Sequence, residues 1–368
     1  MISRRQFVAF SLAGLAAGTL PLKSLLAGTP QALPFLLTAS DDLQGKHFIS
    51  GLDHAGAVLF NVSVPDRCHG GCLRPVSHHA VIFARRPGRH FFVVDTASAA
   101  LSQQINAGSD HHFYGHGVFS PDGQYLYATA NHIASGDGRI LVYDATKDYG
   151  LVNEFPLDGM DPHELRLLPD GETLVVAMGG IHTHPDYDRI KLNLDTMAPA
   201  TVLVNRHSGT VLRRYKPSNH QLSAHHLDVS QEGVVVVGYQ YEGPEWEVPP
   251  LIALLDTRTE TYTEIELSPE QQLEMKNYVA SVAINAATSV AAITAPRGNR
   301  VVLINYRTGE RLNSLKVPDV AGVLACDDGF LVTSGQGGIY EIPGHHGSAV
   351  MLGNAKATWD NHLTLVRS

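Results

Sequence analysis

Tyr114-Gly115-His116-Gly117-Val118-Phe119-Ser120-Pro121-Asp122-Gly123 is the stretch that decides the fold of this chain. A histidine between two glycines leads into a short apolar run, which ends in a Pro-Asp-Gly turn. Proline presets φ at the first position of such a turn and glycine accepts a positive φ, so the stretch predicts a β-strand followed by a hairpin turn.

The same arrangement recurs elsewhere in the chain. Four further segments place a histidine before a short apolar run: Cys68–Leu73 with His69, Asp161–Leu168 with His163, His225–Val229 with His226, and Trp359–Val366 with His362. The chain therefore predicts five strands, each with a histidine at its entrance.

A second repeat consists of apolar, β-branched runs, most of which end in Asp or Asn. They are Val58–Asn61, Phe91–Asp95, Ile140–Asp144, Val202–Asn205, Leu251–Asp256, Val301–Asn305 and the degenerate Gly338–Pro343. A period near 40–50 residues with four short strands per unit is typical of a β-propeller. If each run is the third strand of a blade, the chain is an all-β, seven-bladed β-propeller. Two seven-stranded sandwiches are the weaker alternative.

The two ends of the propeller complement each other. The blade that contains Val58–Asn61 lacks its own first strand, and Asn361–Val366 is a spare first strand at the C-terminus. We expect the two to pair and close the ring, which removes exposed sheet edges. The predicted organisation is a signal peptide at 1–28, a linker at 29–40 and the propeller at 41–368.

The N-terminus predicts export. Ser3-Arg4-Arg5-Gln6-Phe7 precedes an apolar, Ala/Gly-rich run, as in a twin-arginine signal peptide, and this route leads to the bacterial periplasm. The alternative is a membrane anchor, but the apolar run is short and contains Pro21.

Composition narrows the function. The net charge of −9 argues against nucleic acid as a partner, because phosphate binding needs a basic surface. Twenty histidines against three cysteines favour metal or acid–base chemistry. Cys68 and Cys72 would lie about 13 Å apart in a straight strand, so a disulfide would require a turn at Gly70-Gly71.

The first strand of each blade lines the channel of a propeller, so the five histidines should converge at one mouth. Neutral imidazoles with a carboxylate suit iron, copper or zinc. The predicted metal site contains His116, His163 and His226, with His69, His362 and Glu164 as further contacts and His184 in an insertion that covers the mouth. Alternatively, each histidine is a structural latch to the next blade.

Alignment on the turns leaves the register open by one residue. His163 aligns with His225, whereas His116 aligns with His226 and Glu164. Because successive strand residues face opposite sides, only one set can point inward in a rigid register. The flanking Gly115 and Pro162 indicate strands irregular enough to escape this limit.

The motifs YGHGVFSPDG, DPHEL, THPDY with KLNLDTM, QYEG and the terminal WDNHL resemble a family of exported bacterial proteins, domain of unknown function 1513. The family pattern falls on His69, His116, His163, His184, His226 and His362. The resemblance implies a periplasmic seven-bladed propeller. The gene neighbourhoods of the family imply metal or redox work in iron acquisition, with periplasmic iron-uptake or redox proteins as partners.

The sequence thus predicts a periplasmic propeller that binds a transition metal, iron first and copper second, or a small metal-bearing ligand, at a histidine-lined channel mouth. Two other functions stay open. One is a metal-dependent, lactonase-like hydrolase and the other is a non-catalytic interaction scaffold. No Gly-x-Ser-x-Gly elbow, phosphate loop or dinucleotide-binding fingerprint occurs in the sequence.

Overall fold

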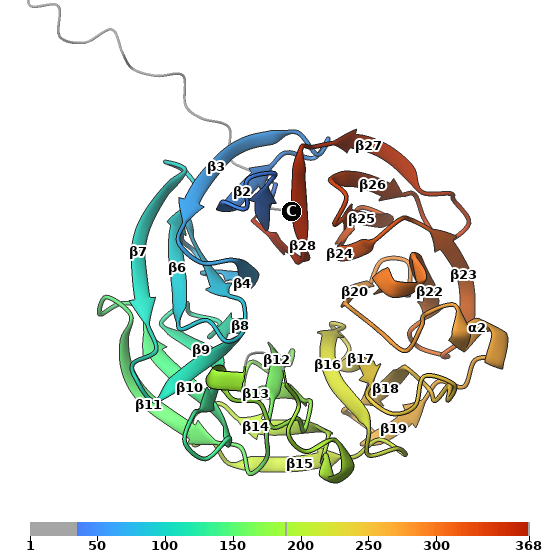
Figure 1. The fold of residues 1–368 in the computed structure, drawn as a ribbon, viewed down its shortest axis with the longest axis horizontal. Coiled ribbons are helices and arrows are strands. Elements are labelled where there is room, and N and C mark those ends of the chain that lie inside the picture. The colour runs from blue at the N-terminus through green and yellow to red at the C-terminus, as the bar shows by residue number, and fades with distance from the viewer. Residues whose placement is uncertain (1–34, 188–189, 367–368) are drawn as a thin grey trace, which may run out of the picture. The chain divides into compact units, whose positions relative to one another are not determined.

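Seven four-stranded antiparallel sheets form a ring in the computed structural model, which describes residues 35–187 and 190–366. Figure 1 shows the sheets as blades around a central channel, with one strand of each blade beside it. The predicted seven-bladed β-propeller is confirmed. The expected signal peptide at 1–28 lies outside the described residues. Within them, no helix is both long enough and apolar enough to cross a membrane.

We number the blades along the chain and name their strands a to d from the channel outward. Blade 1 contains β28 (Ala357–Leu365), β1 (Leu36–Asp42), β2 (His47–Leu52) and β3 (Val58–Val64). Blade 2 contains β4 (Cys68–Leu73), β5 (His79–Ala84), β6 (His90–Asp95) and β7 (Ala100–Asn106). Blade 3 contains β8 (His111–Phe119), β9 (Tyr125–His132), β10 (Gly138–Asp144) and β11 (Gly150–Pro156). Blade 4 contains β12 (Pro162–Leu167), β13 (Thr173–Met178), β14 (Ala200–Asn205) and β15 (Val211–Tyr215).

The remaining blades follow the same plan. Blade 5 contains β16 (Leu222–Val229), β17 (Val234–Tyr241), β18 (Ile252–Asp256) and β19 (Thr261–Glu264). Blade 6 contains β20 (Ser281–Asn285), β21 (Val290–Ala295), β22 (Arg300–Asn305) and β23 (Arg311–Lys316). Blade 7 contains β24 (Val320–Cys326), β25 (Gly329–Ser334), β26 (Gly338–Ile342) and β27 (Val350–Asn354).

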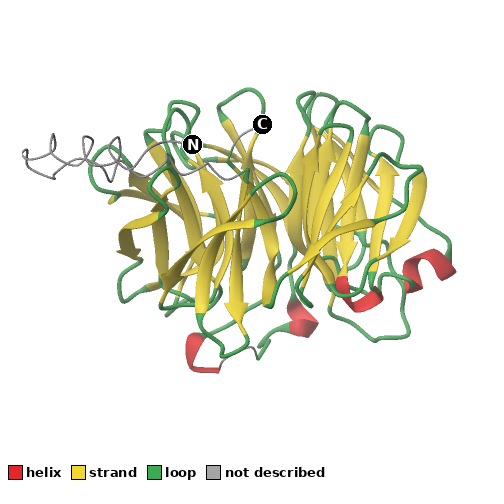
Figure 2. Ribbon diagram, turned by 90° about the horizontal axis from the view of Figure 1, so that it is seen from above, coloured by secondary structure: helices red, strands yellow, loops and turns green. Residues whose placement is uncertain are grey.

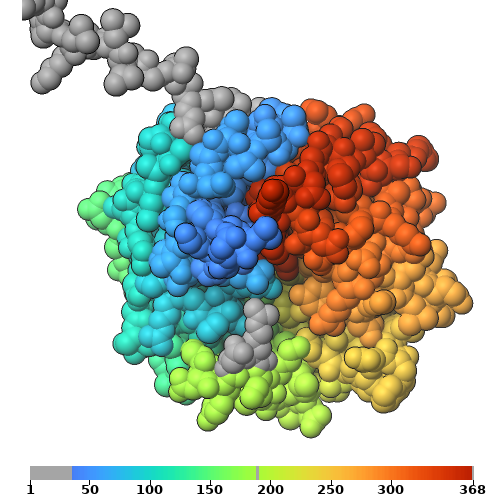
Figure 3. Space-filling model, turned by 45° about the horizontal axis from the view of Figure 1, so that its top comes forward, coloured from blue at the N-terminus to red at the C-terminus, as the bar shows by residue number. Residues whose placement is uncertain are grey.

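The ring closes as predicted. β28 pairs antiparallel with β1, from Leu36 opposite Leu365 to Asp42 opposite Ala357. The space-filling view shows the first and last parts of the described chain, blue and red, side by side (Figure 3). A C-terminal strand therefore joins the N-terminal blade.

Two details of the N-terminal blade differ from prediction. The run Val58–Asn61 lies in β3, the outermost strand, and the third strand is β2 instead. The sequence distance from Asn61 to Asp95 is shorter than that between the other runs, because Val58–Asn61 lies one strand later in its blade. In addition, β1 begins at Leu36, so the propeller starts within the segment 29–40 that was expected to be a linker.

The Pro-Asp-Gly turn forms as its chemistry requires. The N–H of Gly123 donates to the carbonyl of Ser120 at 2.8 Å, and Gly123 adopts φ of +69°. Asp122 accepts the N–H of Gln124 at 3.0 Å through its side chain. These bonds close the hairpin from β8 to β9 at the end of the blade away from the histidines.

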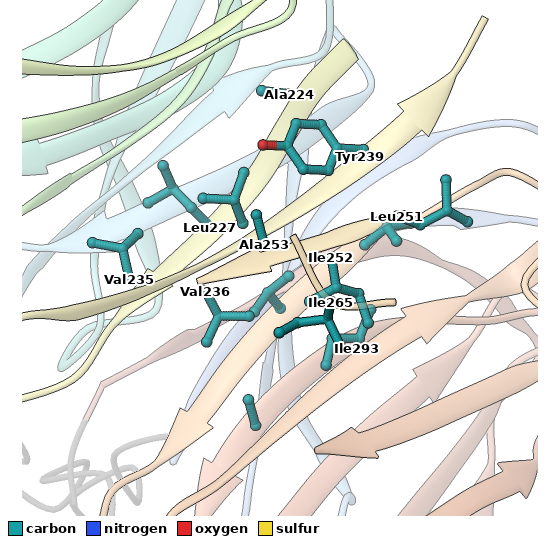
Figure 4. Close-up of a cluster of buried hydrophobic side chains, with 14 of the residues drawn as sticks. Ala224, Leu227, Val235, Val236, Tyr239, Leu251, Ile252, Ala253, Ile265 and Ile293 are labelled. Atoms are coloured by element: carbon teal, nitrogen blue, oxygen red, sulfur yellow. The ribbon is translucent and has the colours of Figure 1, made fainter. Parts of the chain in front are cut away.

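Apolar side chains fill the spaces between blades. Every residue of β17 is buried, because this strand has a neighbouring blade on both faces. Figure 4 shows part of the cluster, in which Ile252 of blade 5 lies near Ile293 of blade 6, whereas Leu227 and Val235 lie on the other face of blade 5. Burying each such side chain contributes roughly 1.5–3 kcal/mol. The packed blades hold the inner strands in place around the channel.

The four helical pieces of the described chain lie on one face of the ring (Figure 2). They are η1 (Pro185–Tyr187), η2 (Leu194–Thr196), α2 (Pro269–Leu273) and η3 (Pro296–Gly298). All belong to connections between strands b and c or from strand d to the next strand a. In an antiparallel blade these connections share one end, where strand a begins. We call this side the entry face.

Candidate metal centre

Most inner strands depart from regular pairing near their entrance. The register shifts between Cys68 and Gly71 in β4, Phe113 and Gly117 in β8, Pro162 and Glu164 in β12, and Ala224 and His226 in β16. In β28 the shift lies between Trp359 and Leu363. Such β-bulges change the direction of the side chains that follow. They resolve the one-residue ambiguity, because His163 and His226 both reach the channel.

Five histidines from five consecutive blades meet in the channel. His69, His116, His163, His226 and His362 are each at most 9% exposed. The ring centres of His69 and His116 lie between 4.5 and 6.4 Å from those of the other members. The irregular backbone makes this approach possible, since Gly115 has φ of +103° and a Cβ there would lie 2.8 Å from the ring of His69.

The cluster contains two overlapping sets of three histidines. One set is His69, His116 and His163, and the other is His116, His226 and His362. Within each set one ring nitrogen per histidine lies within 4.8 Å of the others, so the donors of a set could hold one metal ion. His116 belongs to both sets and is therefore the central residue of the site.

Two buried carboxylates orient members of the cluster. Asp360 bonds Nδ1 of His69 at 2.6 Å and also accepts from Arg85 at 2.7 Å. Glu164 bonds Nδ1 of His226 at 3.1 Å and pairs with Arg166 at 2.7 Å. A carboxylate on one ring nitrogen fixes the tautomer and directs the other nitrogen toward a metal.

Other ring nitrogens have no bonding partner within residues 35–187 and 190–366. They are Nε2 of His116, Nε2 of His362 and Nδ1 of His163. A buried polar atom without a hydrogen bond costs about 1–3 kcal/mol. Three such atoms in one cluster indicate a site built to bind something.

Burial keeps the imidazoles of His69, His116 and His362 neutral. Burial lowers the pKa of His69 to about 4, against the opposing effect of Asp360. Burial and the neighbouring histidines lower the pKa of His116 and His362 well below the ordinary value. Burial alone would raise the pKa of Glu164, but Arg166 and His226 hold it below its usual range. Neutral imidazoles beside an ionised carboxylate form a donor set ready for a cation.

Sequence reasoning missed several members of the site. Asp360 stands two residues before His362 in the terminal motif, and its partner Arg85 directly follows the second strand of the next blade. His225 lies with its ring centre 4.2 Å from that of His163, so the bulge in β16 brings both adjacent histidines to the cluster. Asp161, fully buried, lies 3.8 Å from Nδ1 of His163.

The remaining predicted site residue lies apart from this cluster. His184 belongs to the insertion between β13 and β14, where its Nδ1 accepts the N–H of Asp186 at 3.2 Å and its ring neighbours Tyr187. Cys68 and Cys72 are free thiols in the extended strand β4, so they form no disulfide.

Comparisons with known proteins give a family and a fold. The family model described as "Protein of unknown function (DUF1513)" matches residues 62–366. A search of curated proteins found no match. Among solved structures, Kuenenia stuttgartiensis hydrazine synthase is similar, with a TM-score of 0.60 and 14% sequence identity. The match covers 89% of this chain and 98% of that chain, and at this identity it supports the fold alone.

Proposed function

The chain belongs to the DUF1513 family, and we propose that it is a periplasmic β-propeller that holds a transition-metal ion at its channel histidines. The observation that carries this proposal is that the Nε2 atoms of His116 and His362 have no hydrogen-bond partner in the part of the chain that the structure describes. Both residues belong to one set whose donor atoms lie within 4.8 Å of one another. A structural latch would leave no such buried nitrogens without a partner.

The chemistry of the donors supports a transition metal, and we propose iron first and copper second. Imidazole suits iron, copper and zinc, whereas calcium and magnesium require mostly oxygen ligands. Carboxylates that bond the far nitrogens of His69 and His226 raise the basicity of the ligands. Because a small metal-bearing molecule would present the same ion, it is an equivalent cargo for this site.

We propose the periplasmic localisation from Arg4-Arg5 and the apolar run that follows. With this localisation we propose a role in iron acquisition. Replacing both arginines by lysine should leave the protein in the cytoplasm, because the twin-arginine route requires the pair. Cell fractionation measures this. Unchanged periplasmic recovery would contradict the proposed route.

The decisive experiment is elemental analysis of protein exported natively and purified without a histidine tag. We expect about one iron or copper per chain in the wild type. Turnover of lactones or esters by the loaded protein would favour the hydrolase alternative instead. Metal content at background level, in both native and reconstituted protein, would contradict the proposal and favour the interaction scaffold as the function.

A further inference from the structure

A cavity of about 300 Å³ opens beside the histidine cluster at the entry face. His69, His163, His225 and His226 form its inner end, because their strands line the channel. The charged residues of its outer end come from the connections between strands b and c. A cavity of this size accepts a small organic molecule.

The outer end of the cavity is cationic. Four cations line it: Arg85, Arg86, Lys191 and Arg297. Among the described residues of the lining, Glu242 is the one that carries a carboxylate, and this group is paired with Lys191.

Two other carboxylates lie near the cavity, but neither is available to the remaining arginines. Asp360 bonds Arg85, and Asp161 is buried beside His163 outside the lining. Arg86 and Arg297 therefore remain, and neither has an ion pair within the described parts of the chain.

These two arginines stand far apart around the mouth. Arg86 follows β5 of blade 2, and Arg297 lies in η3 of blade 6, with three blades between them in one direction and two in the other. The Cζ atom of Arg297 lies 4.2 Å from the centre of the Tyr278 ring, a cation–π contact that restrains this side chain. A ligand that meets both arginines must carry anionic groups at more than one end.

We infer that this cavity binds a small polycarboxylate, with carboxylates on Arg86 and Arg297 and one further carboxylate directed toward the histidines. Arginine forms two parallel hydrogen bonds to a carboxylate, which gives such a ligand both affinity and orientation. Neutral imidazoles leave the charge of a metal ion largely uncompensated, so an anionic ligand would complete its coordination. That last contact rests on the proposed function, whereas the arginine contacts do not.

The test is isothermal titration calorimetry of the mature protein with propane-1,2,3-tricarboxylate, both metal-free and loaded with iron. We expect Arg297→Gln and Arg86→Gln each to weaken binding about tenfold to a hundredfold, as loss of a charged hydrogen bond does. Arg258→Gln is the matched control. It removes the same charge, but Arg258 pairs with Asp256 at the opposite face of the ring. Arg297 is exposed, so its substitution should leave the melting temperature unchanged.

The possible outcomes test the polycarboxylate cavity and the metal site separately. Arginine-dependent binding that tightens on metal loading supports both. Arginine-dependent binding by a protein that takes up no metal when it is offered supports the cavity and overturns the metal proposal. Equal affinity in wild type and Arg297→Gln, or tighter binding of inorganic phosphate than of the tricarboxylate, overturns the polycarboxylate assignment even if metal binds.

Discussion

Blades 1 to 5 and blades 6 and 7 share one architecture but differ in what their inner strands carry. In the first five, strand a brings a histidine into the channel, whereas β20 and β24 contain none. The apolar packing between blades does not distinguish the two groups, since the same kind of buried cluster joins blades 6 and 7. The ring therefore provides seven equivalent positions, and the sequence uses five of them for one site.

The comparison also shows that the bulge and the histidine are separate features. β24 has a register shift between Val320 and Val323 although it carries no histidine. β20 pairs regularly with β21, and its Ser281 lies 3.4 Å from Nδ1 of His362. An irregular entrance thus makes room at the channel, and the residue placed there decides whether the blade supplies a metal donor.

The largest effect is expected from removing the strand that completes blade 1. A chain that ends at Lys356 lacks β28 and its pairing with β1, so the inner edge of β1 becomes exposed. Trp359, which is 2% exposed, is lost from the core as well. The total stability of a domain is only about 5–15 kcal/mol, so we expect no cooperative thermal unfolding by circular dichroism. A chain that ends at Val366 is the control and should melt as the wild type does.

The next effect concerns the residue shared by both histidine sets. His116→Ala should reduce bound metal at least tenfold, because both sets lose a donor. Removing an unpartnered buried nitrogen offsets part of the cost of the cavity left behind, so unfolding free energy should change by less than about 2 kcal/mol. His345→Ala in blade 7 is the matched control for elemental analysis. Full metal content in His116→Ala would contradict the proposed centre.

Much of this comparison could be predicted from the sequence. The repeat of apolar runs, the Pro-Asp-Gly turns and the spare strand at the C-terminus require only local chemistry and counting. They gave the number of blades, the closure of the ring and the five strands that carry histidines. Only the N-terminal blade was misassigned, because its outer strand β3 carries the same apolar run ending in Asn that marks third strands elsewhere.

The interior of the site could not be predicted in the same way. A bulge shifts side chains by one position without leaving a clear sequence signal, so the joint arrival of His163, His225 and His226 required the backbone. Asp360 and Arg85 meet only because the ring closes. The cations of the cavity come from connections of unequal length, which no repeat pattern aligns.

Acid should destabilise the metal-free protein through its buried channel histidines. Burial lowers the pKa of His69 to about 4 and that of His116 and His362 well below 6.5. Below pH 6.5 the unfolded chain therefore binds more protons than the folded one. The unfolding free energy of metal-free protein should fall as the pH drops from about 6.5 toward 4, by about 1.4 kcal/mol per pH unit for each such histidine. Urea unfolding at several pH values measures the slope, which His116→Ala should reduce; an unchanged slope would count against these shifts.

A smaller effect is expected from removing either of the two carboxylates that orient the histidines. Asp360→Asn and Glu164→Gln each remove a charge from the far nitrogen of a histidine, so metal affinity should fall about tenfold to a hundredfold. Asp360→Asn should also lower stability more than a turn variant such as Asp256→Asn, because it leaves Arg85 without its carboxylate. Competition with a chelator gives the affinities. If both variants bind metal as the wild type does, the carboxylates serve only the fold.

The smallest effect is expected where a blade without a histidine touches the cluster. Ser281 of β20 meets His362 through a long contact of 3.4 Å, so Ser281→Ala should lower metal affinity by no more than about threefold. The hydroxyl is neutral, so its loss removes one weak contact from Nδ1 of His362 and no charge. Chelator competition alongside Asp360→Asn provides the scale. A loss as large as that of Asp360→Asn would mean that blade 6 orients the site as strongly as the carboxylates do, and the division between the two groups of blades would then be wrong.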